Sequence, residues 1–241
     1  MASKIALLAV TLSVITYVKC LDNGLARTPP MGWISWARFG CTTDCKTHPD
    51  GCINEKLFLT MANLMAKEGF RELGYEYVNI DDCYLAKTRN AKGELQADPL
   101  RFPNGLPYLA KKIHELGLKF GVYEDYGTKT CGGYPGILGH LQKDAETIKS
   151  WGADMLKLDG CNVKISMMNK GYPEMGEYLN KTGRPILYSC SWPDYQRATG
   201  MKFDNSTDIL TLKTQHKSDK KKVNMEYWLK LIMSITTKPE T

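Results

Sequence analysis

The chain has 241 residues, of which 43% are hydrophobic and 24% charged, and its net charge is +6. The excess positive charge is local, because residues 213–222 hold five lysines and one aspartate while the rest of the chain is close to neutral. Nucleic-acid binding needs a basic face with interleaved aromatic residues, so this distribution argues against it. We interpret residues 206–241 as a divergent, solvated basic tail.

Residues 1–20 have the pattern of a signal peptide. Lys4 precedes an apolar run that ends at Val18 and is too short to span a bilayer, and the residues before Leu21 are spaced for cleavage after Cys20. A membrane anchor is the alternative, but no second apolar run follows. We therefore expect a chain of the secretory pathway with no membrane span.

The expected secretory pathway is an oxidising environment, and the cysteines are interpreted accordingly. Seven remain after the signal peptide, and cysteines in an oxidising compartment are expected to pair. Because seven is odd, one thiol lacks a partner within the chain. No paired C-x-x-C or Cys/His cluster is present, so we expect no metal site. Asn180 and Asn205 each begin a sequon and are candidate glycosylation sites on surface loops.

Strand and helix patterns alternate along residues 31–190. Strands are predicted at 31–36, 75–80, 118–123, 153–159 and 185–190. Asn54 can cap a helix on which Leu57, Leu64 and Met65 recur at helical spacing. Further helices are predicted around 106–116, 141–151 and 175–179. This alternation is typical of βαβ units in a parallel sheet.

The predicted fold class is α/β, a (β/α)₈ TIM barrel that is incomplete in this chain. Five units are visible over residues 21–205, whereas a closed barrel needs eight and typically ~250 residues. An open doubly wound sheet is the alternative, but no Gly-rich phosphate loop follows the first strand. The polar residues gather just after the strands, at the face where parallel sheets bind ligands.

The fourth strand ends on Asp159, directly before Gly160. Because alternate side chains share a face, Lys157 and Asp159 point the same way. A cation within reach favours an ionised carboxylate, and such an aspartate at the end of a barrel strand is typical of a nucleophile or a metal ligand. On these residues alone, an aspartate that caps the following turn is the more frequent explanation.

Several motifs together resemble the lysosomal α-galactosidase and α-N-acetylgalactosaminidase family of retaining glycosidases, glycoside hydrolase family 27. The resemblance extends from about Leu21 to about Tyr195, and the motifs occur in the family's order. They are Leu21–Leu25, Pro29–Trp33, Asn79–Cys83, Lys157–Cys161 and Tyr188–Pro193.

The resemblance implies a (β/α)₈ catalytic domain followed by a small β-domain, in a homodimeric lysosomal or secreted enzyme without a cofactor. Its substrates would be glycoconjugates with terminal α-linked galactose or N-acetylgalactosamine. It places the nucleophile on Asp159 and specificity residues at Ser191 and Tyr195. The sugar pocket would consist of Trp33, Asp81, Asp82, Tyr123 and Lys157, and the implied disulfides are Cys41–Cys83, Cys45–Cys52 and Cys131–Cys161.

The residue types suit that chemistry. Two adjacent carboxylates can each accept hydrogen bonds from sugar hydroxyls, and an indole face suits the apolar side of a galactose ring. A retaining mechanism uses one carboxylate as the nucleophile and a second, roughly 5–5.5 Å away, as acid and then base. In isolation, Trp33 would more often be a core residue, and Tyr123 and Tyr195 serve packing as readily as ligand binding.

The sequence also departs from the family pattern. The position after Cys83, usually Trp, is Tyr84, and Ser191 is combined with Asp194, which leaves the sugar preference open. After Asn205 the expected acid/base motif is missing, and Asp219 lies near its spacing only among lysines. Three hypotheses follow: an active hydrolase, a truncated and inactive secreted galactose-binding relative, or an incomplete gene model. Cys190 is then the odd thiol.

Overall fold

The computed structural model describes residues 23–199. The predicted signal peptide, the sequon at Asn205, Asp219 and the basic tail lie outside the described residues. None of the helices in the described part is long and apolar enough to cross a membrane.

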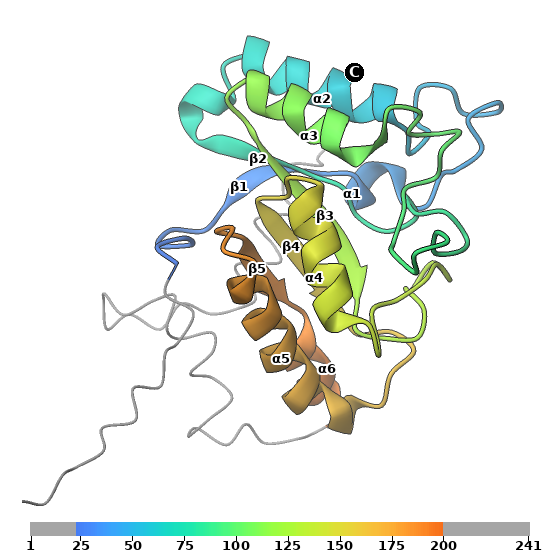
Figure 1. Ribbon diagram of the computed structural model, residues 1–241. Helices are drawn as coiled ribbons and strands as arrows, with labels where there is room; N and C mark the ends of the chain where they lie inside the picture. Colours follow the sequence, from blue (N-terminus) through green and yellow to red (C-terminus); the bar gives the residue numbers. More distant parts are fainter. Residues whose placement is uncertain (1–22, 200–241) are drawn as a thin grey trace, which may run out of the picture.

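One parallel sheet organises the described chain (Figure 1). Its strands are hydrogen-bonded in sequence order, so each strand lies beside the next one along the chain. They are β1 (Met31–Ile34), β2 (Tyr75–Asn79), β3 (Lys119–Asp125), β4 (Met155–Asp159) and β5 (Leu187–Cys190). Five parallel strands in this order form part of a (β/α)₈ barrel, which confirms the predicted fold class.

Helices follow the strands and pack against one face of the sheet (Figure 1). The four longer ones are α2 (Glu55–Lys67), α3 (Gly105–Glu115), α4 (Leu141–Ser150) and α5 (Met168–Lys181). The shorter helices are α1 (Trp36–Phe39), η1 (Arg71–Leu73), η2 (Ile165–Met167) and α6 (Trp192–Ala198). Asn54 caps α2 as predicted, because its side-chain oxygen accepts a hydrogen bond from the Leu57 amide at 2.9 Å.

The two faces of the sheet differ in what they bury. On the helix side, alternate residues of the strands form the main core and are almost fully buried, namely Val78, Phe120, Val122, Leu156 and Leu158. On the inner side, Tyr77, Met155 and Leu187 form a second, smaller cluster against Leu25 and Ala26. Alternate side chains of each strand therefore face either the helix-covered core or the barrel interior.

One strand boundary and two residue placements were predicted wrongly. The first strand ends at Ile34 rather than Trp36, and Trp36 begins α1 with 42% of its surface exposed. Leu64, placed by its spacing with the apolar side of α2, is 44% exposed. Asn180 lies in the last turn of α5 rather than on a loop, although it is exposed as expected.

Candidate active site

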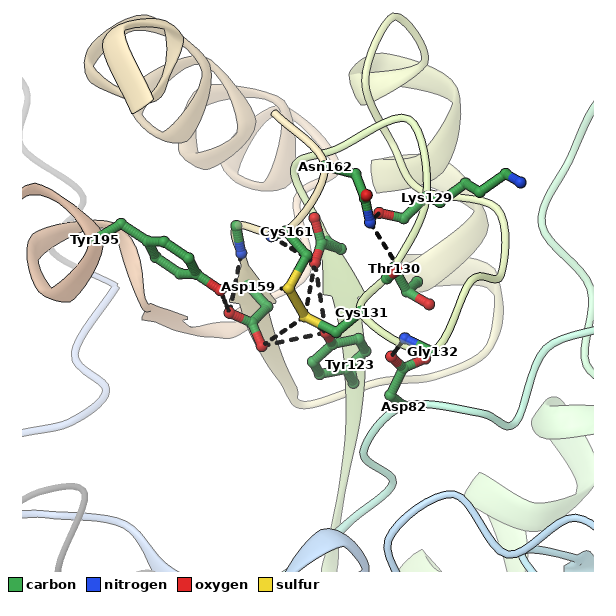
Figure 2. Close-up of a disulfide and its surroundings, with 12 residues drawn as sticks. Asp82, Tyr123, Lys129, Thr130, Cys131, Gly132, Asp159, Cys161, Asn162 and Tyr195 are labelled. Carbon is green, nitrogen blue, oxygen red and sulfur yellow. Dashed lines mark hydrogen bonds between the residues drawn. A yellow bond between two sulfur atoms is a disulfide. The ribbon is translucent and has the colours of Figure 1, made fainter. Parts of the chain in front are cut away.

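Asp159 lies at the C-terminal end of β4, where three donors meet its carboxylate (Figure 2). The Tyr195 hydroxyl donates to Oδ1 at 2.7 Å, and the Gly160 amide donates to the same oxygen at 2.9 Å. The Tyr123 hydroxyl donates to Oδ2 at 3.2 Å. Hydrogen bonds to the charged form stabilise a carboxylate and fix its direction. Three residues predicted from sequence, on β3, β4 and α6, are thus in direct contact.

Lys157 reaches across the sheet to Asp81, which lies two residues beyond the end of β2. Its ammonium group donates to Asp81 Oδ2 at 2.7 Å and lies 5.0 Å from the centre of the Tyr123 ring. Lys157 and Tyr123 are register partners on neighbouring strands, which accounts for that contact. The sequence pattern predicted a cation near Asp159; the ion pair that the structure shows is the one with Asp81.

Asp81, Asp82 and Cys83 form a tight turn in which Cys83 has a positive φ of 75°. Asp82 is 2% exposed and its two oxygens accept hydrogen bonds from the amides of Cys83 and Gly132, both at 2.6 Å. Burial raises the pKa of Asp82 in spite of these donors. Asp81 is equally buried, so both carboxylates are held inside the site rather than on its surface.

Three disulfides surround these residues, with the pairings that the resemblance implied. They join Cys41 to Cys83, Cys45 to Cys52 and Cys131 to Cys161. Cys190 is the unpaired cysteine of residues 23–199, and burial raises the pKa of its thiol to about 12. The first disulfide anchors the Asp81–Cys83 turn, and the third joins the loop after β3 to the end of β4 beside Asp159 (Figure 2).

Asp125 is a site residue that the sequence analysis did not identify. It is the register partner of Asp159, and no part of it is exposed. Its Oδ2 accepts from the Cys161 amide at 3.0 Å and lies 3.5 Å from the Tyr123 hydroxyl, while its Oδ1 has no hydrogen-bond partner. Burial, and then the charges of Asp159 and Asp82, raise the pKa of Asp125 to about 8. Asp125, the neighbour of Asp159 on the next strand, is therefore mostly protonated at neutral pH.

Asp125 also lies close to the sulfurs of Cys131 and Cys161, with all three candidate ligand atoms within 4.8 Å of one another. Those two sulfurs are bonded to each other, so neither is a thiolate that could hold a soft metal ion. The cluster offers one carboxylate and is not a metal centre.

Trp33 and Ser191 are the remaining predicted site residues. Trp33 packs edge-on against Phe39 and Phe58, with ring centroids at 6.1 and 5.5 Å. The residues after Ser191 form α6, with Pro193 in its first turn, so the predicted specificity residue Tyr195 lies on a helix. Asp194 forms an ion pair with Arg197 on that helix.

Comparison with known proteins decides the family. The family model described as alpha galactosidase A matches residues 28–235, which is most of the chain and includes much of the segment predicted to diverge. The chain belongs to this family. It is 56% identical to the alpha-N-acetylgalactosaminidase of Gallus gallus over 177 residues, which cover 73% of this chain and 44% of that protein. It is 53% identical to the alpha-galactosidase A of Homo sapiens over 178 residues, covering 73% and 42%.

Solved structures of the family have the same fold. Alpha-galactosidase I from Mortierella vinacea matches with a TM-score of 0.63 and 43% identity, over 70% of this chain and 41% of that chain. The alpha-galactosidase from Saccharomyces cerevisiae matches with a TM-score of 0.64 and 36% identity, over 72% and 37%. The chain thus spans less than half the length of the relatives it matches.

Proposed function

We propose that this chain carries the nucleophile half of a retaining glycosidase site, which acts on terminal α-linked galactose or N-acetylgalactosamine of glycoconjugates in the lysosome or outside the cell. The family relationship supports the reaction class, since the relatives described above are alpha-galactosidases and alpha-N-acetylgalactosaminidases. The three disulfides are consistent with an oxidising compartment.

The observation that carries the proposal is the environment of Asp159. In the proposed reaction one of its oxygens attacks the anomeric carbon and a glycosyl ester forms, which water then hydrolyses. The hydrogen-bond donors of Tyr123, Tyr195 and Gly160 hold the carboxylate in one orientation before attack. They stabilise its negative charge again when the ester is hydrolysed. Asp81, Lys157 and Trp33 are the proposed contacts of the sugar ring, and Ser191 is the proposed neighbour of its second carbon.

A second candidate is a galactose-binding protein with little or no turnover, and one observation favours it. Within residues 23–199, the carboxyls that accompany Asp159 around Tyr123 are Asp81, Asp82 and Asp125, each at most 2% exposed. None of the three presents a solvent-exposed acid. A site without a positioned general acid commonly loses on the order of 10²–10⁴ in rate, so this second candidate predicts feeble hydrolysis of substrates that need protonation.

A pair of substrates separates the two candidates. An α-galactosyl fluoride releases fluoride without help from an acid, whereas an ordinary alkyl α-galactoside needs one. The hydrolase proposal predicts that the full chain releases fluoride and that Asp159→Asn abolishes the release. Asp50→Asn, a change at an exposed aspartate paired only with Lys56, serves as the matched control and should keep wild-type rates. Binding of galactose without fluoride release from soluble protein would favour the second candidate.

A further inference from the structure

Glu124 is a buried acid whose position in the sheet separates it from the active site. It lies on β3 between Tyr123 and Asp125, so its side chain points to the opposite, helix-covered face. No part of Glu124 is exposed. The charged groups around it are Asp144 on α4, Arg89 in the loop after β2, and Asp82.

Among the described residues, no cation forms an ion pair with this carboxyl. Arg89 binds both oxygens of Asp144, at 2.6 Å each, and its remaining contacts are with the carbonyls of Gly93 and Gly136. Glu124 has no ion pair within residues 23–199, and its Oε2 has no hydrogen-bond partner. An isolated carboxylate in such a place is far more costly than a neutral acid.

The number of protons available around Tyr84 also indicates that Glu124 is neutral. The Tyr84 hydroxyl lies 3.1 Å from Oε1 of Glu124 and 3.0 Å from the backbone carbonyl of Tyr123. A hydroxyl has one proton to donate, and neither a carbonyl nor a carboxylate has any. Both contacts are hydrogen bonds when Glu124 carries a proton, because the acid then donates to Tyr84 and Tyr84 donates to the carbonyl.

We propose that Glu124 is a neutral carboxylic acid that donates to Tyr84, and that Tyr84 relays this bond to the Tyr123 carbonyl, so that the two act as a positioning pair behind the site. Burial raises the pKa of Glu124, and the charge of Asp144 raises it further. The Tyr84 ring is held edge-on by Trp151, at 6.2 Å between centroids.

The pair connects two segments that bear site residues. Tyr84 follows the Asp81–Cys83 turn, and Tyr123 carries the hydroxyl that contacts Asp159. An indole at position 84, the usual residue in the resembling family, has a donor but no acceptor. It could not receive the proton of Glu124, so the tyrosine and the glutamate belong together in this chain. The pairing itself does not depend on the proposed function; only its consequence for Asp159 does.

The pH dependence of unfolding tests the proposal in the full chain. A neutral Glu124 keeps its proton in the folded state and releases it on unfolding at any pH well above ~4.3. While Glu124 keeps its proton in the folded state, it therefore makes the unfolding equilibrium constant rise about tenfold per pH unit above that value. Glu124→Gln should remove this tenfold factor, because the amide is neutral at every pH and can still donate to Tyr84. Glu177→Gln, at an exposed position on α5, should keep the wild-type slope.

The other buried carboxyls affect the pH dependence of unfolding equally in wild type and in both variants. The difference in slope between wild type and Glu124→Gln therefore measures the contribution of Glu124. Equal slopes for wild type and Glu124→Gln would overturn the proposal. A second measurement covers failure of that variant to fold. Infrared difference spectra at pH 7 between wild type and Tyr84→Phe should show a carboxylic-acid carbonyl band that moves when its hydrogen bond is lost. A carboxylate band that responds in its place would equally overturn it.

Discussion

The inner face of the sheet has two ends that are built on opposite principles. At the start of the strands, Met155, Tyr77 and Leu187 are buried together as an apolar layer. Two residues further along β4, the same face carries Lys157, and two further it carries Asp159. The apolar end gains free energy from burial, whereas the other end buries carboxyls that need specific donors. Stability and chemistry are therefore separated along the same strands.

The largest expected effect on stability is at the apolar end. Met155→Ala removes a side chain that is 4% exposed from the middle of the small cluster. Such changes typically cost about 2–5 kcal/mol of unfolding free energy. Urea unfolding should show this loss, while the rate of fluoride release per folded molecule should stay near that of wild type. A variant with unchanged stability would show that the apolar layer does not support the sheet.

At the carboxyl end, Tyr195→Phe should affect the chemistry more than the fold. The change removes the 2.7 Å hydrogen bond to Asp159, and bonds to charged groups contribute about 1.5–3 kcal/mol. We expect fluoride release to fall roughly 10–100-fold with little change in urea unfolding. The exposed Tyr108 on α3 provides the control Tyr108→Phe, which should leave both quantities unchanged.

Asp125→Asn should change the pH dependence of stability. The folded-state pKa of about 8 lies above the ordinary value of 3.8, so the folded chain holds a proton that the unfolded chain releases. The stabilisation is complete below the unfolded pKa and is lost as the pH rises through the folded pKa. Wild type should therefore lose up to about 1.4 kcal/mol per pH unit from this group between pH 5 and 8. Asp125→Asn should lack that share; identical profiles would contradict a neutral Asp125.

The smallest expected effect is at Cys190. Cys190 is partly buried and the pKa of its thiol is raised to about 12, so little thiolate is present near neutral pH. Among the cysteines of residues 23–199, an alkylating reagent should modify one per chain in denaturant without reductant. It should modify none of them under native conditions. Rapid native labelling of Cys190, or a peptide in which it is bonded to another cysteine, would contradict the assignment.

Local patterns were enough to predict the sheet and its four longer helices. The alternation of strand and helix signals, and the side chain of Asn54, depend on neighbours in sequence, so both were predicted correctly. The disulfide pairings came from the resemblance, because spacing alone does not determine connectivity. Contacts made across strands were not predictable: Gly132 reaches Asp82 from a loop, and Asp125 acquires its role from its register with Asp159.

Glu124 and Asp125 show why such roles are hidden in a sequence. The sequence pattern predicted a strand over 118–123, so both residues fell just beyond its predicted end. In the structure they are the last two residues of β3, and both are fully buried on opposite faces. Their chemistry depends on the surrounding helix, loop and disulfide, which come from distant parts of the chain.

The central claim is that Asp159 is the nucleophile, and mapping a trapped glycosyl ester tests it most directly. The full chain is incubated with a fluorinated galactosyl fluoride that forms the ester quickly and hydrolyses slowly, and is then digested and sequenced by mass spectrometry. We predict one added fluorosugar on the peptide that contains Asp159, and no addition in Asp159→Asn. A sugar attached to Asp81, Asp82 or Asp125, or undiminished labelling of the variant, would contradict the account.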